Sequence, residues 1–139
     1  MRAVLDTNVI VSALISSRGA PAALLDLWWE GVFELAISDQ MLDELQRVLA
    51  YPKVRRVLRY SDEQIADTLA LFQHGALYIE AVAPITELER DPADTMILAT
   101  AVATCASVVV SGDADLLSIE DYQGIPIVTP VKFLAWVVG

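Results

Sequence analysis

The chain has 139 residues, with 19 acidic and 9 basic side chains and a formal net charge of −10. Hydrophobic residues make up 55% of it and charged residues 20%, a balance that excludes an intrinsically disordered chain. The negative net charge excludes nucleic-acid binding by overall charge alone, so contact with RNA or DNA would need a local group of cations.

The sequence contains one cysteine, Cys105, and one histidine, His74. These counts exclude an internal disulfide and a Cys-rich zinc site, and they argue against a histidine relay. No run of about 18 uninterrupted apolar residues predicts a membrane span, and no cleavage-site pattern follows the apolar N-terminus. We therefore expect a soluble, reduced, cytoplasmic protein with a single domain over residues 1–139.

In the first half of the chain, apolar runs and helix signals alternate. Ser38 is the predicted N-cap of one helix, and Ser61 with Gln64 forms a predicted capping box. A proline stands near the start of the second helix, as is common. The predicted strands are 2–5 and 33–37, and the predicted helices are 9–15, 21–30, 39–49, 53–59 and 61–74.

The second half continues the alternation. Asp91 and Pro92 open a predicted helix, and Thr129 and Pro130 cap the last one. The predicted strands are 77–81, 107–110 and 125–128, and the predicted helices are 91–105 and 130–137. Because the strands are apolar runs that alternate with helices, we expect an α/β fold whose parallel sheet of about five strands is covered on both faces.

Ligand sites of such folds lie beyond the carboxyl ends of the strands. Asp6 and Asp113 each follow an apolar strand directly, and Asp115 comes close behind. Helical spacing places Asp94 in the middle of an apolar stripe and Glu44 at the margin of another, whereas Asp43 points outward. The sequence thus predicts that several carboxylates converge at one edge of the sheet.

Carboxylates gathered in this way repel one another unless a cation joins them. Oxygen ligands suit Mg²⁺ or Mn²⁺, and no histidine or cysteine is placed to favour zinc. Ions of this kind bind phosphate and assist hydrolysis of phosphodiester bonds.

Each acid also has a structural interpretation. Asp6 fits a turn, and Asp113 fits the cap of a following helix. Asp91 can cap a helix with Asp94 in its first turn, and Glu44 can pair with Arg47 three residues later. A purely structural role for every one of these acids, each at the point where the strands converge, is less expected than one site that they share.

Several segments together resemble the PIN-domain (PilT N-terminus) nuclease family, notably the ribonuclease toxins of bacterial and archaeal toxin–antitoxin pairs. The resemblance covers essentially the whole chain. It is specific because all of the matching segments occur together and in the same order along the chain. The matching segments are Val4-Leu5-Asp6-Thr7-Asn8, Leu42-Asp43-Glu44-Leu45, Asp91-Pro92-Ala93-Asp94-Thr95-Met96-Ile97-Leu98-Ala99, Val110-Ser111-Gly112-Asp113-Ala114-Asp115-Leu116-Leu117, and Ile125-Pro126-Ile127-Val128-Thr129-Pro130 with Phe133-Leu134.

The resemblance implies a Rossmann-like three-layer α/β/α sandwich and an endoribonuclease that depends on Mg²⁺ or Mn²⁺. It implies an antitoxin protein as partner. The implied catalytic and metal-binding acids are Asp6, Glu44, Asp94 and Asp113, with Asp115 as a possible fifth ligand. Thr7, Asn8 and Ser111 are implied to orient ligands or water; Ser111 stands where many relatives have threonine and keeps the hydroxyl.

Two further features bear on partners. Five of the nine cations lie within thirteen positions and are candidates for RNA contact, for binding an acidic antitoxin segment or for a solvated helix face: Arg47, Lys53, Arg55, Arg56 and Arg59. Adjacent Trp28 and Trp29 point about 100° apart on a helix, so one is expected outside the core, where it would suit a homodimer or antitoxin interface.

Three alternatives stay open. The chain could be a PIN nuclease that processes RNA outside toxin–antitoxin systems, or a non-catalytic RNA-binding protein of the same fold. A receiver-type signalling module also gathers acids above a parallel sheet. That module needs adjacent acids after its first strand, whereas Asp6 is followed by Thr7 and Asn8.

Overall fold

The computed structural model describes residues 1–80, 82–88 and 90–139. Within these residues the sheet has six strands in the order β3-β2-β1-β4-β6-β5. Neighbouring strands are parallel except for β5, which pairs antiparallel with β6. The strands are β1 (Arg2–Leu5), β2 (Glu34–Ser38), β3 (Leu77–Ile79), β4 (Val108–Val110), β5 (Asp121–Tyr122) and β6 (Ile125–Val128).

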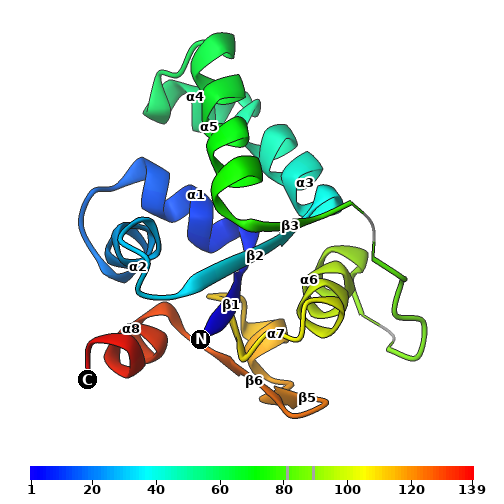
Figure 1. Ribbon diagram of the computed structural model, residues 1–139. Coiled ribbons are helices and arrows are strands. Elements are labelled where there is room, and N and C mark those ends of the chain that lie inside the picture. Colours follow the sequence, from blue (N-terminus) through cyan, green and yellow to red (C-terminus); the bar gives the residue numbers. More distant parts are fainter. Residues whose placement is uncertain (81, 89) are drawn as a thin grey trace.

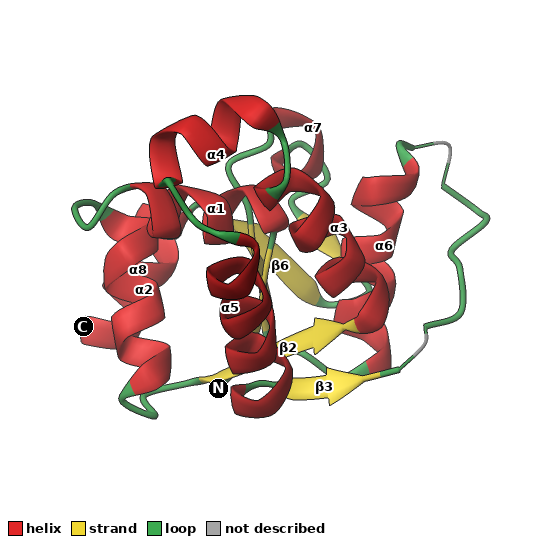
Figure 2. Ribbon diagram, turned by 90° about the horizontal axis from the view of Figure 1, so that it is seen from above, coloured by secondary structure: helices red, strands yellow, loops and turns green. Residues whose placement is uncertain are grey.

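Helices cover both faces of this sheet, which confirms the expected three-layer α/β/α arrangement (Figures 1 and 2). On one face α6 packs against β1, β2 and β4; on the other, α2 packs against α1 and α8. The helices are α1 (Thr7–Ile15), α2 (Ala20–Trp29), α3 (Asp39–Leu49), α4 (Pro52–Leu58), α5 (Asp62–Gly75), α6 (Pro92–Ala103), α7 (Ala114–Leu117) and α8 (Pro130–Val138).

No single helix among the described residues has both the length and the apolar character to cross a membrane. By length and composition α1 and α2 would pass only as a pair, and a bend of 96° separates them.

Most helices begin where the sequence predicts, because their caps form. The Ser38 hydroxyl accepts a hydrogen bond from the backbone N–H of Met41 at the start of α3. At α5, Ser61 and Gln64 exchange the two bonds of a complete capping box. Prolines occupy the first turns of α2, α4, α6 and α8, where a missing N–H costs nothing.

Three short features differ from the prediction. The four-residue α7 was expected only as a possibility behind Asp113, because one helical turn is too short to show a periodicity. The two-residue β5 was not predicted; Gln123 and Gly124, with φ of 52° and 84°, turn it back onto β6. The predicted strand 77–81 ends at Ile79, and Ala81 lies outside the described residues.

The core lies around the central strands. All three residues of β4 and the last three of β1 are fully buried, as apolar strands covered on both faces should be. The adjacent tryptophans separate as expected: Trp28 is buried and stacks on Phe72, whereas Trp29 is 64% exposed.

Candidate active site

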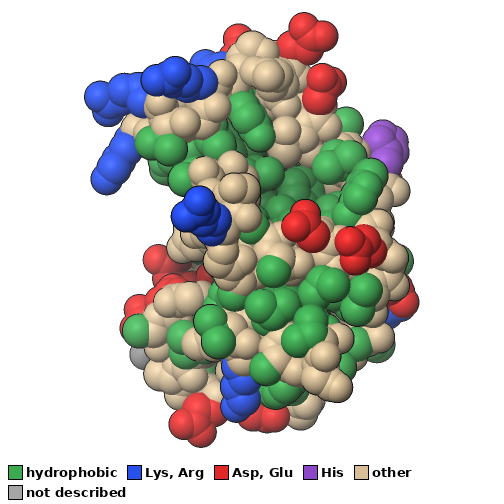
Figure 3. All heavy atoms as spheres, turned by 90° about the vertical axis from the view of Figure 1, so that its left-hand side faces the viewer, with side chains coloured by type: hydrophobic (Ala, Val, Ile, Leu, Met, Phe, Trp, Pro, Cys, Tyr) green, Lys and Arg blue, Asp and Glu red, His purple; other side chains and the backbone are tan. Residues whose placement is uncertain are grey.

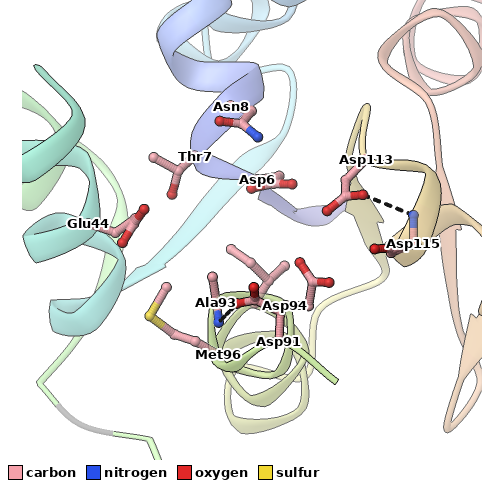
Figure 4. A pocket seen from close by; sticks show the side chains of 11 residues that line it. Asp6, Thr7, Asn8, Glu44, Asp91, Ala93, Asp94, Met96, Asp113 and Asp115 are labelled. Carbon is pink, nitrogen blue, oxygen red and sulfur yellow. Dashed lines mark hydrogen bonds between the residues drawn. The ribbon is translucent and has the colours of Figure 1, made fainter. Parts of the chain in front are cut away.

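A cavity of about 180 Å³ opens at the carboxyl ends of β1 and β4, between α3 and the first turns of α1, α6 and α7 (Figure 4). This is the edge at which a parallel α/β sheet binds its ligands. All five acids predicted as metal ligands line the cavity, together with Thr7 and Asn8. The full lining is Asp6, Thr7, Asn8, Glu44, Asp91, Ala93, Asp94, Met96, Ile97, Asp113 and Asp115.

Asp6 lies at the junction of β1 and α1. Its backbone N–H bonds the carbonyl oxygen of Val110 at 2.8 Å, which ties the end of β1 to the end of β4. The Ser111 hydroxyl donates to Oδ2 of Asp6 at 2.7 Å. Burial raises the pKa of the Asp6 carboxyl. Hydrogen bonds from the Ser111 side chain and from the Asn8 and Thr7 backbone lower this pKa, and the negative charge of Asp113 raises it. The net shift of the pKa is upward.

Ser111 connects Asp6 to the acids of the next loop. It is fully buried, and its Oγ accepts a hydrogen bond from the Asp113 backbone N–H at 2.9 Å. Asp113 in turn caps α7 by accepting from the Asp115 backbone N–H at 2.9 Å. The capping role foreseen for Asp113 therefore coexists with a place in the cavity lining.

Asp94 enters the cavity from the first turn of α6. Asp91 caps this helix through the Ala93 backbone N–H, at 2.8 Å, and Asp94 is only 8% exposed, as the helical spacing predicts. Its pKa is raised to about 6, first by burial and then by the negative charges of Asp113, Asp91 and Asp6. The carboxylates thus repel one another across the cavity.

Glu44 faces the cavity from α3, on the side opposite Asp115 in Figure 4. Its side chain is 22% exposed and forms an ion pair with Arg47, three residues later. Asp43 is exposed, as expected from the same helix. The structural interpretation of Glu44 as a partner of Arg47 is correct, and Glu44 also lines the cavity.

Buried hydroxyl groups hold α3 against α6, the helices that carry Glu44 and Asp94. The Thr100 hydroxyl on α6 contacts the Ser38 hydroxyl at 2.9 Å and donates to the Met96 carbonyl oxygen at 2.9 Å. Both Ser38 and Thr100 are fully buried. The same serine that caps α3 therefore also positions it.

The sequence prediction missed two residues beside the cavity. Asp91 was expected only as a cap, but it also lines the cavity and raises the pKa of Asp94. Arg90 precedes it, and its Nη1 donates to the Asp115 carbonyl oxygen at 3.3 Å. The place of Asp91 in the fold could have indicated its role. It caps a helix that starts at the carboxyl edge of the sheet, so the cap residue lies at that edge as well.

The structure separates the five candidate RNA-contacting cations. Arg47 lines a hollow that adjoins the cavity, whereas the other four lie on α4 and at its end (Figure 3, upper left). Arg55 on α4 pairs with Asp62. These four, Lys53, Arg55, Arg56 and Arg59, are absent from the cavity lining found among the described residues.

The donors around the cavity are carboxylate, hydroxyl and amide oxygens, the set that suits a hard divalent cation. Across the described ranges, no three acidic, histidine or cysteine side chains are drawn together as tightly as metal ligands. A cation between them would relieve the repulsion that raises the pKa of Asp94. The residues present therefore fit such an ion by chemistry and charge, after rotation of their side chains.

Comparison with known proteins identifies a family. Residues 2–115 match a family model described as PIN domain. An uncharacterized protein of Methanocaldococcus jannaschii is 32% identical over 123 residues, which are 87% of this chain and 76% of that protein. The crystal structure of VapBC2 from Rickettsia felis, bound to a DNA fragment from its promoter, has a chain that shares the fold: the TM-score is 0.66 at 22% identity, over 93% of this chain and 98% of that one.

Proposed function

Since this chain belongs to the PIN domain family of nucleases, we propose that it is an endoribonuclease dependent on Mg²⁺ or Mn²⁺ and the toxin of a toxin–antitoxin pair. The observation that carries the proposal is the environment of Asp94: a buried carboxylate that faces Asp6 and Asp113 and is destabilised by their charge. Such repulsion favours a function in which the three acids share a cation.

The proposed catalytic acids are Asp6, Glu44, Asp94 and Asp113, and Asp115 is an additional proposed metal ligand. A divalent cation held by these acids would supply Lewis acidity for the attack of water on phosphorus and for the departure of the leaving oxygen. Ser111 fixes the Asp6 carboxylate through its 2.7 Å bond and holds the loop of Asp113. Thr7 and Asn8, at the first turn of α1, are proposed to orient ligands or water.

The proposed partners are RNA, an antitoxin protein and a second copy of this chain. For RNA, the cations of α4 offer phosphate contacts on the surface beyond the cavity. For protein partners, hydrophobic side chains gather on the face that Figure 3 presents. The helices α2 and α8 expose large apolar side chains: Trp29, Trp136 and Val138 are 64%, 41% and 65% exposed. An apolar surface of this kind favours a protein interface.

RNA cleavage by the purified chain tests the proposed activity. We expect cleavage with Mg²⁺ or Mn²⁺, none with EDTA, and a loss of at least about a hundredfold in Asp94→Asn, which removes a charged ligand but keeps the side-chain shape. Arg18→Ala, in the exposed loop that follows α1, is a matched surface control purified in the same way. Equal cleavage by wild type and Asp94→Asn would indicate a contaminating nuclease, and no cleavage of several RNA classes would contradict the proposal.

The toxin assignment needs a separate test. Induced expression of a toxin should arrest growth, and Asp94→Asn should not. RNA cleavage without growth arrest would instead favour a PIN nuclease that processes RNA outside toxin–antitoxin systems.

A further inference from the structure

Two arginines stand on opposite sides of the acidic cavity. Arg47 pairs with Glu44 on the α3 side, and Arg90 bonds the Asp115 carbonyl oxygen on the α7 side. Figure 4 shows Glu44 and Asp115 on opposite sides of the cavity. Arg47 therefore contacts the cavity lining on the Glu44 side and Arg90 contacts it on the Asp115 side, while neither arginine belongs to the lining itself.

Two further hollows adjoin the cavity, and we call the three together the trench. A second hollow, lined by Gln40, Asp43 and Arg47, shares Glu44, Asp91, Ala93 and Met96 with it. A third, between α1 and the starts of α7 and α8, shares Asn8 and Asp113 with it. Hollows that share walls on both sides of the cavity suit a polymer that passes through the site and continues in both directions.

Charge makes such a polymer difficult to hold. Six carboxylates line the cavity, and the whole chain carries a net charge of −10. A divalent cation among the acids offsets repulsion only at the central phosphate. Phosphates on either side need their own cations.

We propose that Arg47 and Arg90 bind the phosphates that flank the scissile phosphate of a single-stranded RNA. The inference rests on the proposed function and adds the two residues that hold the strand across the site. Arg47 is 64% exposed and uses one Nη for Glu44, while its guanidinium carries five N–H donors. A cation held by Glu44 would compete with Arg47 for the carboxylate and would leave the guanidinium available to phosphate.

Fluorescence anisotropy of a labelled single-stranded RNA of twelve uracil nucleotides tests the proposal. Binding is measured with Ca²⁺, at several salt concentrations, with a gel to verify that the RNA stays intact. Arg47→Ala and Arg90→Ala should each lower affinity about tenfold and reduce the slope of log affinity against log salt by about 0.7, the loss of one single-strand phosphate contact. Arg47→Lys should restore most of the slope, because it keeps the charge.

Arg18→Ala is the matched control, since it removes the same charge from an exposed loop residue that is absent from the linings of the three hollows. Affinity and slope for both alanine variants equal to those of this control would overturn the proposal. Binding of a labelled oligoglutamate peptide is measured in parallel. If the two alanine variants lose affinity for this peptide while their affinity for RNA is unchanged, the proposal is overturned and the ligand is an acidic protein segment. If wild type cleaves RNA and the arginine variants bind it normally, only this inference fails; if wild type neither binds nor cleaves RNA, the proposed function fails with it.

Discussion

At the scale of single residues, the site is built by placing acids where they are unfavourable for folding. Asp94 is buried beside three other carboxyl groups, and its pKa rises to about 6 from a reference value of 3.8. The pKa of Asp6 is raised as well. Acids arranged in this way lower the stability of the folded protein and create a local negative charge that attracts cations.

The raised pKa of Asp94 makes the stability of the metal-free protein depend on pH. Between about pH 4 and pH 6 the folded state holds a proton that the unfolded state has lost, so the free energy of unfolding falls as pH rises through this window and stays lower above it. In EDTA, Asp94→Asn should flatten this profile and raise the free energy of unfolding at pH 7.5 by roughly 1–2 kcal/mol. Urea denaturation of wild type and Asp94→Asn at pH 4.5 and 7.5 measures the free energy of unfolding at each pH.

A variant no more stable than wild type at pH 7.5 would contradict this account of Asp94. Asp26→Asn is the matched control: it makes the same substitution on α2, away from the acids of the cavity, and its pH profile should follow wild type.

The Ser111 hydroxyl should matter more for activity than its size suggests. Ser111→Ala leaves Oδ2 of Asp6 and the Asp113 backbone N–H without their buried partner, and should lower cleavage about 10- to 100-fold. Ser111→Thr keeps the hydroxyl and should retain most of the activity. Steady-state cleavage rates of the two variants check this, and an equal loss in both would indicate a packing effect instead.

Sequence reasoning reached some of these residues and not others. Helical spacing predicted that Asp94 is buried and that Glu44, unlike Asp43, faces inward, because a helix repeats by local geometry. The bond between Ser111 and Asp6 depends on the pairing of β1 with β4, in which Leu5 lies opposite Val110. Strand register joins residues far apart in the sequence, so spacing alone could not show the contact.

At the scale of elements, caps and hydroxyl contacts decide how the helices present their acids. Ser38 caps α3 and contacts Thr100 of α6, so one side chain links the helix of Glu44 to the helix of Asp94. The cap was predictable from the residues around it, whereas the contact with Thr100 requires the packing of two helices.

Ser38→Ala should therefore affect both stability and activity. We expect the free energy of unfolding to fall by about 1–2 kcal/mol, from loss of the cap and of a buried hydrogen bond, together with a lower cleavage rate. Ser61→Ala removes the cap of α5, which carries no residue of the cavity lining, and should cost about 1 kcal/mol with the cleavage rate unchanged. Urea denaturation and cleavage assays of both variants separate the two effects, and equal losses of activity would contradict the positioning role of Ser38.

The length of a helix or strand determines whether it could be predicted from the sequence. The parallel strands and long helices were foreseen because apolar runs and caps recur over many residues. The single turn of α7 and the two residues of β5 are too short for any periodicity, so neither element could be recognised from its pattern.

At the scale of the whole molecule, charge is unevenly distributed. Acids line the carboxyl edge of the sheet, while four cations lie on or at the end of α4, a separate part of the surface (Figure 3). The net charge of −10 predicts that RNA binding needs local cations. The sequence grouped Arg47 with the α4 cations by proximity along the chain, and only the fold shows that it belongs to the trench.

The origin of the oxygen added on cleavage tests the central claim most directly. RNA is cleaved with Mg²⁺ in H₂¹⁸O, and the product ends are analysed by mass spectrometry at early times. If the acidic cavity promotes attack by water, each new phosphate end carries one ¹⁸O and no 2′,3′-cyclic phosphate forms, and the products disappear with Asp94→Asn. Unlabelled cyclic phosphate ends, formed equally by wild type and Asp94→Asn, would contradict the account.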